Sequence, residues 1–226
     1  MSERTWVKIC GLSTAETVDA AVDAGADAVG FVFAPGSPRS VSVETARELV
    51  ERVPAGVETV GVFRGQPVSD VLTMAEASGV ATVQLHGDEG PADAARVRQA
   101  GLRVIRAVSA EVWLSEGDAA RRAWGEHRLL LDAPDPGAGA TFDVDALLGD
   151  RPSGPWLLAG GLTPANVGGL VGRLSPSGVD VSSGVEVARG VKSTQLVHRF
   201  IEAARAPAAE VPPTTRVGPR APRQGG

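Results

Sequence analysis

The segment "WVKICGLSTAETVDAAVDAGADAVGFVF", residues 6–33, contains a complete strand–helix–strand unit. Short apolar, β-branched runs at 6–10 and 28–33 flank a stretch with helical character. Either Ser13 or Thr14 is a suitable N-cap for that helix. Two strands joined by a helical crossover are expected to be parallel neighbours in one sheet.

The same unit recurs along the chain. Further strands are expected at 58–63, 81–86, 102–108, 128–133, 156–160 and 179–183. Helix start signals lie between them: Ser42 as an N-cap, Pro91 at a first helical position, and Thr163 before Pro164. The strands are almost continuously apolar, as in sheets with both faces buried.

Eight such units favour an α/β fold with a single (β/α)₈ TIM barrel. The alternative is a doubly wound open sheet, which usually carries a glycine-rich nucleotide loop after its first strand. The segment "CGLSTAE", residues 10–16, has one glycine there, which makes that alternative weaker.

The barrel domain is expected to span residues 1–205 of the 226. Residues 206–226, "APAAEVPPTTRVGPRAPRQGG", are rich in Pro, Gly and Arg and contain almost no large apolar side chain. Such a segment cannot bury enough surface to offset its ordering entropy, so a disordered tail is predicted.

Composition excludes several function classes. The formal net charge is −5 and the pI is about 5.3, without the basic footprint of a nucleic-acid-binding protein. The single cysteine excludes an internal disulfide and a Cys-rich metal site, and no metal is expected. No signal peptide or membrane-length apolar run is present, which favours a cytoplasmic protein with no membrane partner.

In a (β/α)₈ barrel the reaction site lies at the carboxyl ends of the strands. The chemically capable residues expected there are Cys10, Arg39, His86, Asp132, Gly160, Gly161, Asp180, Ser182, Ser183 and Gly184. Each has an ordinary structural explanation: a buried small thiol, a loop cation, a packed imidazole, a helix cap or a tight turn. Such residues would be scattered over both barrel faces, whereas all of these fall on one face.

Together these residues predict a site for a phosphorylated small molecule. The glycines and serines after the seventh and eighth strands can offer backbone and hydroxyl donors to a phosphate. Arg39 can bind a carboxylate through paired N–H donors. The Cys10 thiol and the Asp132 carboxyl group can act as a base and an acid.

The chain resembles the phosphoribosylanthranilate isomerase family of tryptophan biosynthesis. The matching stretches, in family order, are "VKICGL", "GADAVGFVFAPGSPRSVS", "VGVF", "VQLHG", "LLLDA", "GATFDVD", "LAGGLTPANV" and "VDVSSGVE", from residue 7 to about 186. Each stretch alone is weak evidence, whereas their combination is specific.

The resemblance implies a cofactor-free Amadori rearrangement of N-(5′-phosphoribosyl)anthranilate to 1-(2-carboxyphenylamino)-1-deoxyribulose 5-phosphate. It implies that Asp132 is the general acid, that Cys10 is the general base, and that Arg39 binds the anthranilate carboxylate. A free thiol has a pKa of roughly 8.5, so a basic Cys10 needs a positive or donor-rich environment. An acidic Asp132 needs partial desolvation or a neighbouring anion. The oligomeric state is left open between monomer and homodimer.

The chain departs from the family pattern in several loops. Ala140 takes the place of a lysine, Val144 of a common tryptophan, and Arg64 of a frequent asparagine, while "GVKS" replaces "GVKD".

Related alternatives are the isomerase of histidine biosynthesis, which has an aspartate where Cys10 stands, and indole-glycerol-phosphate synthase, whose lysine and glutamates cannot be placed here. A non-catalytic barrel that binds a phosphorylated ligand is a third alternative, disfavoured by the pairing of Cys10 with Asp132.

Overall fold

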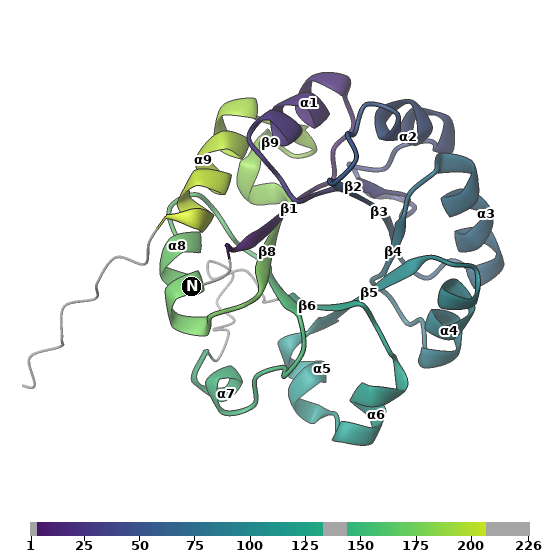
Figure 1. The fold of residues 1–226 in the computed structure, drawn as a ribbon, viewed down its shortest axis with the longest axis vertical. Coiled ribbons are helices and arrows are strands. Elements are labelled where there is room, and N and C mark those ends of the chain that lie inside the picture. Colours follow the sequence, from purple (N-terminus) through teal and green to yellow (C-terminus); the bar gives the residue numbers. More distant parts are fainter. Residues whose placement is uncertain (1–3, 133–143, 207–226) are drawn as a thin grey trace, which may run out of the picture.

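The computed structural model describes residues 4–132 and 144–206, and its principal strands close into one parallel barrel (Figure 1). The strands are β1 Trp6–Cys10, β2 Ala28–Val32, β3 Glu58–Phe63, β4 Thr82–Leu85, β5 Arg103–Ser109, β6 Arg128–Asp132, β7 Trp156–Ala159 and β8 Gly178–Val181. They pair in chain order, and β8 closes the ring against β1. The predicted (β/α)₈ barrel is therefore confirmed, with strand ends within two residues of the expected bounds.

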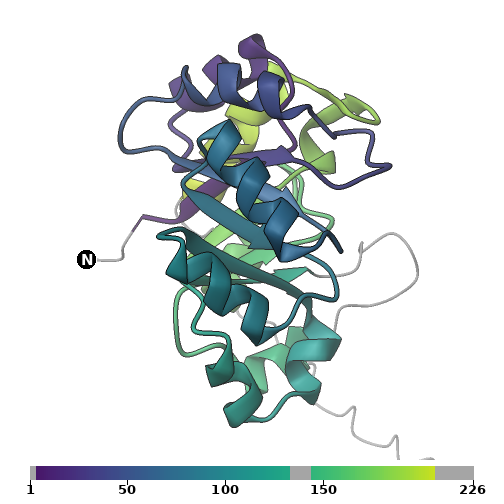
Figure 2. The same ribbon diagram turned by 90° about the vertical axis from the view of Figure 1, so that its right-hand side faces the viewer.

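Helices surround the strands in Figure 1, and the side view in Figure 2 shows helices lying over the strands on the side that faces the viewer. They are α1 Ala15–Asp23, α2 Val43–Val50, α3 Val68–Ser78, α4 Pro91–Gln99, α5 Ala110–Ser115, α6 Asp118–Ala123, α7 Val144–Gly149, α8 Val167–Leu174 and α9 Thr194–Arg205. Local sequence sets their starts: the Thr14 hydroxyl accepts a hydrogen bond from the Thr17 amide at 3.3 Å and caps α1. Val18 and Ala21, three residues apart, bury one face of that helix.

One helix start was predicted wrongly. Thr163 and Pro164 are not the beginning of α8, which starts at Val167. The reason is the Asn166 side chain, whose Oδ1 accepts a hydrogen bond from the Thr163 amide at 2.8 Å and holds these residues in a turn. The helix begins only after this turn.

A small antiparallel hairpin follows β8 and was not expected from the sequence. A 3₁₀ turn at Ser183–Val185 leads into β9 Glu186–Ala188, which pairs with β10 Val191–Lys192. Gly190 packs so closely on the loop after β2 that a Cβ there would lie 2.8 Å from the Pro38 carbonyl oxygen. The hairpin thus lies at the end of the barrel to which the strands point.

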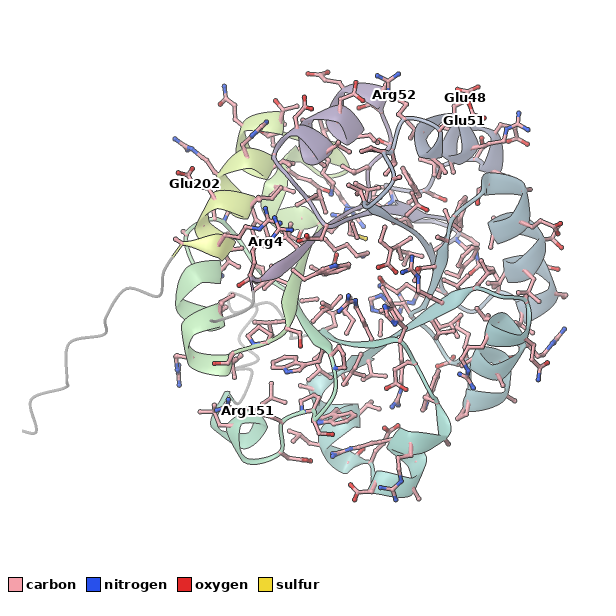
Figure 3. The ribbon with its side chains drawn as sticks, in the orientation of Figure 1. Arg4, Glu48, Glu51, Arg52, Arg151 and Glu202 are labelled. Carbon is pink, nitrogen blue, oxygen red and sulfur yellow. The ribbon has the colours of Figure 1, made fainter. Side chains whose placement is uncertain are left out.

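The barrel interior is apolar at its centre. Its buried cluster consists of Ala28, Val60, Ile105, Ala107, Leu130, Leu157 and Ala159. A larger apolar layer fills the space between the strands and the helices. Charged side chains such as Glu48, Glu51 and Glu202 lie on the outer side of the helices (Figure 3). Buried polar residues break the apolar pattern inside the barrel: Lys8, Glu58, Thr82, Gln84 and Asp180 are examples.

Some expectations fall outside the described residues. They concern Ala140, in the segment 133–143, and the predicted tail from residue 207 onward. Ser193, which replaces the family's aspartate, is described: its hydroxyl accepts a hydrogen bond from the Leu196 amide and caps α9, as a carboxylate would. Among the described residues, no helix is long and apolar enough to cross a membrane.

Candidate active site

A cavity of about 330 Å³ opens at the carboxyl ends of the strands. All of the residues selected from the sequence line it: Cys10, Arg39, His86, Asp132, Gly160, Gly161, Asp180, Ser182, Ser183 and Gly184. Residues from β1, β6 and β8 therefore meet at one place, although they are far apart in the chain. Their individual roles stay predictions.

The thiol of Cys10 lies deep in this cavity. Cys10 is 6% exposed and ends β1 beside Gly30 of β2. A Cβ on Gly30 would lie 3.0 Å from the Cys10 sulfur and 3.2 Å from Cε of Lys8, so the glycine leaves room for both side chains. Burial raises the pKa of the Cys10 thiol, and attraction to the Lys8 ammonium opposes that rise without cancelling it. A buried cation thus lies beside the thiol inside the barrel, and it was not predicted from the sequence.

The carboxyl group of Asp132 is more open. Its side chain is 41% exposed at the end of β6, and Oδ2 lies 3.4 Å from Nε2 of His86. His86 follows β4 directly, because the strand ends at Leu85. The two side chains form a polar edge of the cavity that can exchange protons with solvent, in contrast to the buried thiol. The described residues contain no group of three or more potential ligands placed to hold a metal ion.

Arg39 is fixed by a carboxylate of the hairpin. Its Nε and Nη2 donate to the two carboxylate oxygens of Glu186 at 2.7 and 2.8 Å. This bidentate pair uses one edge of the guanidinium. The expected grip on a substrate carboxylate therefore has to come from the remaining edge, which carries Nη1. Burial alone would raise the pKa of Glu186, but hydrogen bonds from Arg39, Lys192 and the Gly190 amide lower it to about 2.

Lys192 connects the hairpin to the loop after β8. Its buried ammonium donates to Glu186 at 2.7 Å and to the Ser182 carbonyl oxygen at 2.9 Å. It also lies 3.2 Å from the Ser182 hydroxyl. A cation is therefore held directly beside one of the residues expected to bind phosphate. Burial lowers the pKa of Lys192 despite its pairing with Glu186.

The loops after β7 and β8 are in close contact. Gly160 and Gly161 have φ angles of +85° and +57°, a region in which glycine is favoured. A Cβ on Gly184 would lie 1.7 Å from the Leu162 carbonyl oxygen, so only glycine fits where the two loops meet. The side-chain Nδ2 of Asn166 donates a hydrogen bond to the Gly161 carbonyl oxygen at 2.9 Å and stabilises this arrangement of the two loops. Backbone donors are thereby collected in the place where barrels often bind phosphate.

Asp180 is engaged within the protein. Its Oδ1 accepts a hydrogen bond from the Lys8 ammonium at 2.8 Å, in an ion pair in which Lys8 is fully buried. The two residues are direct neighbours in the register of β1 and β8. Asp180 also lines the cavity, so its carboxylate is in contact with both the cavity and the buried Lys8 ammonium.

Several residues of this site were not identified from the sequence. Gln84 and Arg64 line the cavity, while Lys8, Glu186 and Lys192 hold the residues that do. The sequence does mark Lys8 and Gln84, because each is a long polar side chain in a strand of mostly apolar residues. Glu186 and Lys192 belong to a hairpin that was not expected, and their contacts were not accessible from the sequence.

Comparisons with known proteins agree with this geometry. The sequence profile of the family "N-(5'phosphoribosyl)anthranilate (PRA) isomerase" matches residues 7–203. The N-(5'-phosphoribosyl)anthranilate isomerase of Rubrobacter xylanophilus is 44% identical over 203 residues, which cover 88% of this chain and 98% of that protein.

Solved structures give the same result. TrpF from Jonesia denitrificans is 44% identical with a TM-score of 0.80, covering 89% of this chain and 97% of that one. A phosphoribosyl anthranilate isomerase in complex with reduced 1-(o-carboxyphenylamino)-1-deoxyribulose 5-phosphate is 35% identical with a TM-score of 0.76, covering 88% and 98%. The chain belongs to the N-(5'-phosphoribosyl)anthranilate isomerase family.

Proposed function

We propose that this chain converts N-(5′-phosphoribosyl)anthranilate to 1-(2-carboxyphenylamino)-1-deoxyribulose 5-phosphate, with Asp132 as general acid and Cys10 as general base. The observation that carries this assignment is that the only thiol of the chain and the Asp132 carboxyl group, from β1 and β6, line the same cavity. Family membership and the relative solved with the reduced product analogue support the choice of substrate.

The reaction requires two proton transfers. Asp132 donates a proton to the furanose ring oxygen, the bond from that oxygen to C1 breaks, and the anthranilate nitrogen lone pair forms a C=N bond to C1. The Cys10 thiolate then removes the proton from C2, and the electron pair of that C–H bond moves to form an enolamine. Tautomerisation of the enolamine gives the ketone, so atoms and electrons balance without a cofactor.

The remaining residues hold the two ends of the substrate. We assign the phosphate to the backbone and hydroxyl donors of Gly161, Ser182, Ser183 and Gly184, and the anthranilate carboxylate to the free edge of Arg39. With both ends anchored, the ribose lies between the thiol and the carboxyl group. His86 stands 3.4 Å from Asp132 and is assigned to orient it. Gly160 shapes the phosphate loop.

Paired variants test the assignment. We expect Cys10→Ser and Asp132→Asn each to reduce kcat at least a hundredfold, because general acid–base catalysis contributes about 10²–10⁴-fold. Asp70→Asn on the exposed face of α3 is the matched control and should retain activity. Growth of a tryptophan auxotroph that lacks this isomerase, restored by the wild type alone, would identify the substrate in the cell. Near-normal turnover of both site variants would refute the assignment.

We also propose that the enzyme acts in the cytoplasm as a monomer or a homodimer on a small phosphorylated substrate, without nucleic-acid or membrane partners. Analytical ultracentrifugation at several protein concentrations distinguishes the two assembly states. Cell fractionation tests the location.

A further inference from the structure

Lys8 is a fully buried cation that the proposed reaction does not yet use. It belongs to β1, two residues before Cys10, so both side chains point into the barrel. Its ammonium lies 2.8 Å from the Asp180 carboxylate, and no part of its side chain is exposed. Burying a lysine costs several kcal/mol unless it is paired, and an apolar side chain of similar size often serves stability equally well. Stability alone therefore gives no reason for an ion pair at this position.

The geometry directs this cation to the thiol. Gly30, the neighbour of Cys10 on β2, provides the space in which both side chains lie, since an added Cβ would lie 3.0–3.2 Å from the Cys10 sulfur and Cε of Lys8. Asp180 on β8 holds the ammonium from the other side. The lysine and the thiol of β1 and the carboxylate of β8 are thus gathered at and directly beneath the cavity.

We infer that Lys8 is a positioning residue that favours the thiolate form of Cys10 for removal of the C2 proton. This inference rests on the proposed function, because the thiolate is needed only if Cys10 acts as a base.

Electrostatics support this assignment. Burial raises the pKa of Cys10, attraction and a hydrogen bond from Lys8 lower it, and the Asp180 charge raises it. Burial would lower the pKa of Lys8, but Asp180 and Cys10 together raise it above its usual value, so the ammonium stays charged. Arg39 and Lys192 also attract a thiolate at this position, but Lys192 lowers the pKa of Cys10 less than Lys8 does, and both cations share the Glu186 carboxylate.

The single cysteine permits a direct test without substrate, because alkylation by iodoacetamide reports on Cys10 alone. We expect the pH midpoint of the alkylation rate to rise by about 1–3 units in Lys8→Met, the range seen when one opposite charge is lost. In Asp180→Asn the midpoint should fall, because the anion that opposes the thiolate is removed. Lys8→Arg should stay near the wild type.

The opposite signs separate this role from a merely structural one. If loosened packing were the cause, both single variants would shift the midpoint in the same direction, and that result would overturn the inference, as would an unchanged midpoint in Lys8→Met. Lys8→Met leaves Asp180 unpaired and destabilises the barrel, so Lys8→Met/Asp180→Asn is the second variant. Its midpoint should also rise, because the influence of Lys8 on the thiol exceeds that of Asp180.

Isomerase kinetics then distinguish this inference from the proposed function. We expect the lower-pH limb of kcat/KM in Lys8→Met to move upward by the same amount as the alkylation midpoint. A midpoint that moves while wild-type protein shows no isomerase activity would refute the proposed function. An active wild type whose Lys8→Met variant keeps the wild-type pH profile would refute the role of Lys8.

Discussion

Glu186 is the residue whose replacement tests the architecture of the site most directly. Its carboxylate accepts hydrogen bonds from Arg39 at 2.7 and 2.8 Å, from Lys192 at 2.7 Å and from the Gly190 amide at 3.0 Å. The side chain is 5% exposed, so solvent screens these contacts little. In Glu186→Gln, one acceptor oxygen becomes an NH₂ group that faces Arg39 together with either Lys192 or the Gly190 amide.

The size of the effect follows from the pKa of Glu186, which is lowered from 4.5 to about 2. Such a decrease corresponds to about 3 kcal/mol in favour of the folded state. Because the pKa is lower in the folded state, this contribution is complete above pH 4.5 and is lost as the pH falls toward 2. At pH 3.5, about 1.4 kcal/mol of it is already lost.

Urea unfolding at a series of pH values measures this contribution. We expect the wild type to exceed Glu186→Gln by about 3 kcal/mol in free energy of unfolding at pH 7, and the difference to shrink by more than 1 kcal/mol at pH 3.5. Glu48→Gln on the exposed side of α2 is the control and should follow the wild type at both values. A difference that stays constant down to pH 3.5 would show that the carboxylate charge does not stabilise the hairpin.

Three further variants test neighbouring features. Lys192→Met should raise KM about tenfold with a smaller change in kcat, because the ammonium beside Ser182 is lost, and steady-state kinetics measure both constants. Gly184→Ala should lower the melting temperature and weaken inorganic phosphate binding in calorimetry, because its Cβ would lie 1.7 Å from the Leu162 carbonyl oxygen. Gln84→Met should stabilise the fold by about 1 kcal/mol in urea, because the buried Oε1 has no hydrogen-bond partner among the described residues, while KM rises.

The barrel was predictable because its evidence is local and repeated. Alternating apolar strands and capped helices reveal each unit, and the parallel arrangement follows from the crossovers. The hairpin Glu186–Lys192 escaped prediction because its strands are short and expose Val187 and Val191, so no apolar alternation marks them. The start of α8 was misplaced because a side-chain contact of Asn166 overrides a good proline signal.

The residues that line the cavity were predictable for a geometric reason. The contacts that hold these residues in place were not predictable. Every strand of a parallel barrel points to one face, so polar residues at strand ends gather there whatever their separation in the chain. The partners beneath them depend on register across the barrel: Lys8 meets Asp180 across 172 positions, and Arg39 meets Glu186 across 147. The sequence alone does not give the register between the strands, so it does not reveal such pairs.

Depth in the barrel explains how the two groups that we propose to transfer protons can differ so strongly in solvent exposure within one cavity. Asp132 lies at the open edge, where its side chain is 41% exposed and solvent can replace a donated proton. Cys10 is 6% exposed, and its burial opposes ionisation of the thiol. A thiolate there therefore has to be stabilised by a fixed cation instead of by solvent. A lysine on the same strand, held by a carboxylate on the next, meets that need without entering the space of the substrate. In the proposed reaction, Asp132 at the solvated edge of the cavity therefore donates a proton, and Cys10 beside the buried Lys8 accepts one.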